Sequence, residues 1–100
     1  MHKQTPAQAA ATEAWEEAGL TGKAYDRCLG VYTYPKRTKT ETFPVITLVY
    51  PVKVTAVHSD WPEAHQRRRK WVSLSKAASR VQEPELKRII ASFTPDMVKR

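Results

Sequence analysis

An alanine-rich segment near the start of the chain, residues 5–22 (T-P-A-Q-A-A-A-T-E-A-W-E-E-A-G-L-T-G), constrains the fold more than any other stretch. Thr5 is a capping residue, Pro6 suits the first position of a helix, and Gln8 completes a T-x-x-Q capping box. Gly19 stands where a left-handed C-terminal cap is expected. The segment therefore predicts a helix of about three turns.

Three carboxylates share one face of this helix, because Glu13, Glu16 and Glu17 are spaced i, i+3 and i+4. Alanines fill the opposite face, which would let the helix lie close against a sheet. The carboxylates repel one another by about 0.2–0.5 kcal/mol per pair. A bound Mg²⁺ or Mn²⁺ ion would remove that repulsion, since hard divalent cations prefer oxygen ligands. The pattern E-x-x-E-E taken alone also fits a solvated acidic face.

The formal net charge of the chain is +7, and basic residues gather in two other places. The clusters are Lys36, Arg37 and Lys39, and the run Arg67, Arg68, Arg69 and Lys70. Such clusters favour polyanionic partners that carry phosphate groups: nucleotides, inositol phosphates or nucleic acid. A solvated basic surface is the alternative for each cluster taken singly.

The length of 100 residues predicts a single domain with one core. No apolar run approaches the about 18 residues of a membrane span, and we expect no signal peptide, no membrane partner and a cytoplasmic location. We interpret the lone Cys28 as a buried small residue in a reducing compartment. Trp15, Trp61 and Trp71 are interpreted as core or helix-packing residues rather than as platforms for base stacking.

The rest of the chain alternates between strand-like and helical patterns. The expected elements are a strand at 25–34 with a bulge or a close approach at Gly30, a hairpin-type loop at 35–44, a β segment at 45–57 interrupted by Pro51, a short strand at 71–73, a helix at 75–81 and a helix that starts at Pro84. In that last helix Leu86, Ile89, Ile90 and Phe93 form one apolar stripe. This order of elements predicts an α+β fold in which a mixed β-sheet packs between helices as an α/β/α sandwich.

The stretch E-A-W-E-E-A-G-L, residues 13–20, resembles the second half of the Nudix box, G-x5-E-x7-R-E-U-x-E-E-x-G-U, in which U is apolar. Thr12 stands where the family has Arg, and Gln4 stands where it has the first Glu. The box glycine would fall before Met1, so we expect the chain to start inside the motif and to lack the N-terminal strands of the family. Sheet edges left unpaired in this way would favour a homodimer.

The segment D-W-P-E-A-H-Q-R-R-R-K-W-V-S-L-S-K-A-A, residues 60–78, resembles the branch of that family that hydrolyses diphosphoinositol polyphosphates and dinucleoside polyphosphates. The resemblance implies a metal-dependent diphosphate hydrolase that uses Mg²⁺ or Mn²⁺. It implies that Glu16 and Glu17 are the main metal ligands and that Glu13 is a further ligand or the base that activates water.

By position in the same branch, the residues that would contact substrate phosphates are Arg37, Lys39, Arg67, Arg68 and Arg69. The partner of such an enzyme is a small polyphosphate, and nucleic acid is not favoured. The alternative is a catalytically weakened domain of the same fold that binds a phosphorylated ligand or nucleic acid through its basic clusters.

Overall fold

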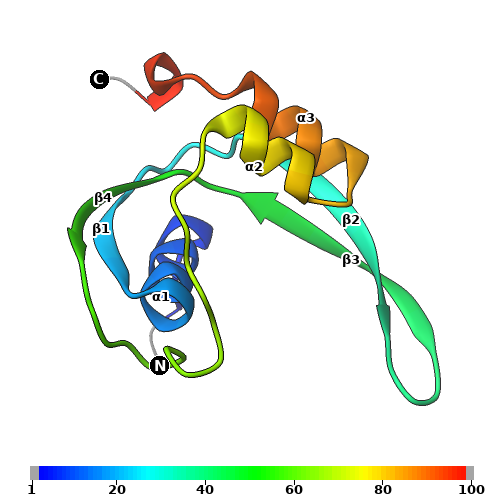
Figure 1. Cartoon of the computed structure of the whole chain (residues 1–100). Helices are drawn as coiled ribbons and strands as arrows, with labels where there is room; N and C mark the ends of the chain where they lie inside the picture. The colour runs from blue at the N-terminus through cyan, green and yellow to red at the C-terminus, as the bar shows by residue number, and fades with distance from the viewer. Residues whose placement is uncertain (1–2, 99–100) are drawn as a thin grey trace. The chain divides into compact units, whose positions relative to one another are not determined.

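The computed structural model describes residues 3–98, which form two compact units that we treat separately (Figure 1). The described residues of the first unit are 3–28 and 50–71, and those of the second are 29–49 and 72–98. The fold is α+β, as the sequence predicts. Among the helices described, none combines the length and apolar character that a membrane crossing requires.

The first unit begins with helix α1, Pro6–Ala18, and its two ends are capped as expected. The backbone N–H of Gln8 donates to the Thr5 hydroxyl oxygen (3.1 Å), and the backbone N–H of Thr5 donates to the Gln8 side-chain oxygen (2.9 Å). Gly19 adopts the left-handed conformation with φ of 68°. Local sequence chemistry is therefore sufficient to define both boundaries of this helix.

Helix α1 leads directly into strand β1, Leu20–Ala24, which pairs antiparallel with β4, Val52–Val57. The pairing has an irregularity between Thr21 and Gly22, and a Cβ on Gly22 would collide with the carbonyl oxygen of Lys53. The sequence pattern did not predict β1. Its five residues carry a weak strand signal, and the partner that stabilises it lies about 30 residues further along the chain.

The second unit contains a β-hairpin formed by β2, Gly30–Arg37, and β3, Thr42–Val49. Thr38 closes the turn, because its backbone N–H (2.8 Å) and its hydroxyl (3.0 Å) both donate to the Glu41 carbonyl oxygen. The expected loop at 35–44 is therefore shorter than predicted, and Pro35 lies opposite Pro44 inside the strands. Both strands of a two-stranded sheet are edge strands, where a missing N–H is tolerated.

Helices α2, Leu74–Arg80, and α3, Pro84–Ser92, pack against each other in this second unit, and a 3₁₀ turn follows at Pro95–Val98 (Figure 1). Pro84 begins α3, as predicted. The Ser73 side chain caps α2, so this helix starts one residue before the predicted 75. A Cβ on Gly30 would lie 2.6 Å from Cδ1 of Ile89, so the predicted apolar stripe of α3 faces β2 at that residue.

Several sequence predictions are wrong in detail. Residues 25–29 and 71–73 are not strands, and the β segment at 45–57 is split at Tyr50 and Pro51. The described strands form two separate antiparallel pairs rather than one mixed sheet. Cys28 is exposed rather than buried. The buried apolar residues of the described chain are the small Ala7 and Ala78, so large side chains contribute less to a core than expected.

Candidate functional site

Helix α1 presents the predicted acidic face, and its carboxylates have different surroundings. Glu13 and Glu16 are exposed, and within the described residues neither side chain accepts a hydrogen bond or forms an ion pair. The Glu17 carboxylate is partly covered and lies 3.4 Å from the Arg67 guanidinium. Two of the three candidate ligands are therefore uncompensated, and the third is held by a cation.

No three His, Cys, Asp or Glu side chains of residues 3–98 are grouped so that they could hold a metal ion as they stand. The chemistry of the acidic face nevertheless fits Mg²⁺ or Mn²⁺, since its donors are carboxylate oxygens. Glu13 and Glu16 lie one turn apart on an exposed face. A change of side-chain rotamer, without movement of the backbone, brings such neighbours together. Glu13, Glu16 and Glu17 are the residues that would hold the ion.

A segment that we name the strap, residues 58–69, runs beside the C-terminal end of α1 (Figure 1). A helix leaves its last carbonyl oxygens without partners, and the strap supplies donors for them. The bonds are Glu63 N–H to Glu16 O (3.0 Å), Trp61 Nε1–H to Glu17 O (3.1 Å), Arg69 Nη1–H to Ala18 O (2.8 Å) and His58 N–H to Gly19 O (2.9 Å). The strap thus fixes the turn that carries Glu16 and Glu17.

Trp61 and Arg69 form the packed centre of this contact. The Arg69 guanidinium lies 4.3 Å from the centre of the Trp61 ring, in a cation–π arrangement. Both side chains lie directly against Gly19, where a Cβ would lie 2.6 Å from the Trp61 ring and 2.9 Å from Arg69 Nη1. Gly19 is therefore required both for its left-handed backbone and for this close approach.

The arginines of the basic run, residues 67–69, have different surroundings. Arg67 donates from Nε to Glu63 Oε1 (2.9 Å) and also pairs with Glu17, while Arg69 is bound to the end of α1. Arg68 is exposed and has no hydrogen bond or ion pair to the described residues. Of the three arginines predicted to contact phosphate, Arg68 alone is left uncommitted within this part of the chain.

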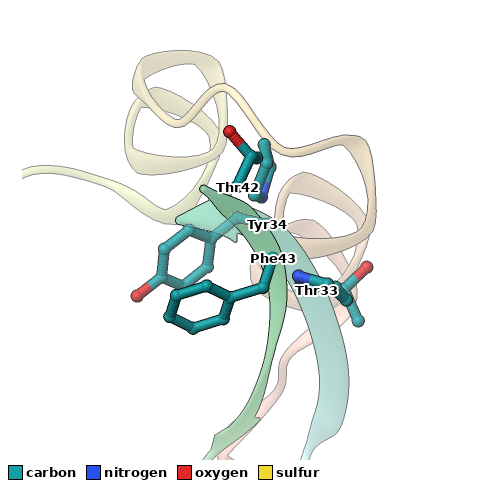
Figure 2. A pocket seen from close by; sticks show the side chains of 6 residues that line it. Thr33, Tyr34, Thr42 and Phe43 are labelled. Atoms are coloured by element: carbon teal, nitrogen blue, oxygen red, sulfur yellow. The ribbon is translucent and has the colours of Figure 1, made fainter. Parts of the chain in front are cut away.

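Arg37 and Lys39, the other two predicted phosphate contacts, are exposed and lie in the hairpin of the second unit. Arg37 ends β2 opposite Thr42, and Lys39 lies in the turn. A cavity of about 280 Å³ on this hairpin is lined by Thr33, Tyr34, Pro35, Thr42, Phe43 and Pro44. Figure 2 shows the Tyr34 and Phe43 side chains among the residues that line it, and no charged residue is among them.

A second cavity, of about 310 Å³, lies in the first unit at the end of α1. Its lining residues are Ala18, Leu20, Arg68, Arg69, Lys70 and Trp71. Trp71 is 66% exposed, so its interpretation as a core residue is wrong, whereas Trp15 and Trp61 are partly buried and make ring contacts. The sequence did not predict that Trp71 lines a cavity, although its position directly after four basic residues was a signal.

Gln4 and Thr12, the two positions that depart from the motif, are bonded to each other. The Gln4 side-chain N–H donates to the Thr12 hydroxyl oxygen over 2.7 Å. A neutral hydrogen bond therefore stands where the family pattern would place a glutamate and an arginine.

Comparison with known proteins places the chain in a family. The model of the NUDIX domain matches residues 2–97. The chain is 35% identical over 86 residues to "Nudix hydrolase 21, chloroplastic" of Arabidopsis thaliana, with 86% of this chain and 42% of that protein covered. It is 31% identical over 96 residues to "Nudix hydrolase 12, mitochondrial" of the same plant, with 90% and 46% covered.

A third similar protein is "Nudix hydrolase 16, mitochondrial" of Arabidopsis thaliana, which is 33% identical over 88 residues, with 84% of this chain and 48% of that protein covered. The chain thus spans 42–48% of the length of these relatives. No solved structure matches it. Because these relatives are named chloroplastic or mitochondrial, the cytoplasmic location expected from the sequence is wrong.

Proposed function

The chain belongs to the Nudix domain family, and on this premise we propose that it is a metal-dependent hydrolase that cleaves a diphosphate linkage in a nucleoside or inositol polyphosphate. The observation that carries the proposal is the pair of uncompensated carboxylates, Glu13 and Glu16, on a helix whose motif spacing matches the Nudix box. We also propose that the 100 residues act as a single domain and belong with the diphosphoinositol and dinucleoside polyphosphate branch.

In this proposal Glu16 and Glu17 hold Mg²⁺ or Mn²⁺, and Glu13 is a further ligand or the base that takes a proton from the attacking water. When bound, the ion neutralises charge on the phosphoryl oxygens and lowers the pKa of water. The strap keeps Glu16 and Glu17 in place, because it hydrogen-bonds the backbone carbonyls of both residues.

The basic residues would hold the phosphates of the substrate. Arg68 is free to do so from the first unit, and Arg37 and Lys39 are exposed on the hairpin of the second. Arg67 must leave Glu17, and Arg69 must leave the end of α1, before either can bind phosphate. Arg68, Arg37 and Lys39 are therefore the stronger candidates of the five.

A phosphate-release assay with and without added Mg²⁺ tests the proposal, with diadenosine and inositol polyphosphates as substrates. The Glu16→Gln variant should lose at least about 100-fold in rate, because it removes both charge and a ligand from the metal-binding face. Asp26→Asn, an exposed acid outside the helix, is the matched control and should retain activity. Equal phosphate release from the Glu16→Gln variant and the unmodified chain would refute the assigned site.

A second candidate function is a weakened domain that binds a phosphorylated ligand or nucleic acid without cleaving it. The neutral Gln4–Thr12 bond and the Arg67–Glu17 ion pair favour it, since both reduce the negative charge available to a cation. Salt-sensitive binding of a polyanion with no phosphate release in Mg²⁺ or Mn²⁺ would support this function over hydrolysis.

A further inference from the structure

The cavity at the end of α1 combines an exposed indole with cations. Trp71 is 66% exposed, more than Val57, Leu74 or Phe43, and it forms one wall of the cavity of about 310 Å³. Arg68, Arg69 and Lys70 contribute to the same lining. A large aromatic surface left in water beside positive charge is suited to a ligand that has both a flat ring and an anionic part.

The charges of this cavity are not all equivalent. Arg69 donates to the Ala18 carbonyl (2.8 Å) and therefore offsets the partial negative charge at the C-terminus of α1. Arg68 and Lys70 are exposed, and within the described residues neither has a hydrogen bond or an ion pair. These two cations are consequently available to an anion, and Arg69 removes the repulsion that the helix end would exert on it.

We propose that Trp71 is the stacking platform for a nucleobase, and that Arg68 and Lys70 hold the phosphates of the same nucleotide. This inference rests on the proposed function and narrows its substrate class to nucleoside polyphosphates. An inositol ring is not planar or aromatic and gains nothing from the indole face, whereas every nucleobase has a π-face. The volume of about 310 Å³ lies at the lower end of the range for small-molecule sites, about 300–1,000 Å³, and suits a base with its phosphates toward solvent.

The cavity lies close to the acidic face that would bind the metal. Ala18 lines it and follows Glu17 directly in the last turn of α1. Phosphates held by Arg68 therefore lie at the same end of the helix as the carboxylates that would bind the metal. The hairpin cavity of Figure 2 has aromatic rings as well, but its lining contains no charged residue, so it provides the matched control.

The test is calorimetric binding of ATP and of inorganic tripolyphosphate to the whole chain, in a buffer with EDTA so that no cleavage occurs. ATP should bind at least about fivefold more tightly than tripolyphosphate, because stacking of one base contributes about 1–3 kcal/mol. Trp71→Leu should abolish this preference and leave tripolyphosphate binding unchanged, and Trp71→Phe should retain most of it. Phe43→Ala should change neither affinity.

Equal affinity for ATP and tripolyphosphate in the unmodified chain would overturn the inference. A loss of both affinities in a Trp71→Leu variant that still folds would indicate a packing role and would also overturn it. If Phe43→Ala lost the preference for ATP and Trp71→Leu kept it, the base would bind in the hairpin cavity and the inference would be wrong. If a single-stranded oligonucleotide bound much more tightly than ATP, the ligand of this cavity would be nucleic acid rather than a nucleotide, and the inference would be overturned. A retained ATP preference in a chain that releases no phosphate would support the inference while refuting the hydrolase.

Discussion

At the scale of single residues, Arg68 and Arg69 are neighbours in sequence with different surroundings. Arg69 donates to the Ala18 carbonyl oxygen and stacks on the Trp61 ring, whereas Arg68 contacts no described residue through a hydrogen bond or ion pair. A buried or half-buried guanidinium that satisfies a helix end is a structural group, and an exposed one is available for a ligand.

Substitution separates these two roles. Arg69→Gln should lower the free energy of unfolding by about 1–3 kcal/mol, because it removes a charged hydrogen bond and a cation–π contact. Arg68→Gln should leave unfolding unchanged within about 0.5 kcal/mol and weaken tripolyphosphate binding. Urea denaturation followed by circular dichroism, together with calorimetry, measures both effects. Equal destabilisation by the two variants would contradict the assignment.

At the scale of the element, three features occur on helix α1: the capping box, the acidic face and the Gln4–Thr12 bond. The capping box and the left-handed Gly19 define where the helix starts and ends. The Gln4–Thr12 bond lies on its N-terminal side and replaces charge with a neutral contact. The helix thus has the caps that its sequence predicts, while the charges at residues 4 and 12 differ from the family pattern.

Restoring the pattern with Gln4→Glu and Thr12→Arg together should tighten Mn²⁺ binding by about 10- to 100-fold, which is the effect of residues that orient metal ligands. The physical reason is that Gln4→Glu adds a negative oxygen donor and Thr12→Arg can order the carboxylates. A Mn²⁺ titration followed by electron paramagnetic resonance measures the change. Thr12→Arg alone serves as the control and should strengthen binding less than the double variant, because it orders the carboxylates without adding an oxygen donor. Unchanged affinity in the double variant would argue against a metal role for this helix.

At the scale of the whole molecule, the hairpin leaves apolar side chains in water. Ile46 is 71%, Val31 48% and Leu48 45% exposed, and their positions in the β2–β3 register put them on one face. Both strands also have an unpaired edge within the described sheets. Such surfaces favour association with another chain, and the homodimer expected from the sequence remains our proposal.

Ile46→Lys should weaken self-association by about tenfold or more, because a lysine on an edge strand opposes pairing and lowers the apolar area. Sedimentation equilibrium over a range of protein concentrations measures the association constant. Thr40→Lys, which adds the same charge in the exposed turn, is the matched control. An unmodified chain that stays monomeric throughout the range would exclude the homodimer.

Sequence alone determined helix α1, its caps and the shared face of Glu13, Glu16 and Glu17, because these features depend on contacts within a few residues along the chain. The same holds for Pro84 at the start of α3. The family, too, is indicated by the spacing of the motif in residues 13–20, which is a property of the sequence itself.

Only the tertiary structure decided what the basic run and the tryptophans do. Arg69 and Ala18 are 51 residues apart, and Trp61 and Glu17 are 44 apart, so their hydrogen bonds depend on where the strap runs. Strand β1 likewise exists because β4 lies beside it. A long, flexible side chain has many possible partners in an unfolded chain, and the folded backbone selects one of them by bringing a particular carbonyl or ring within reach.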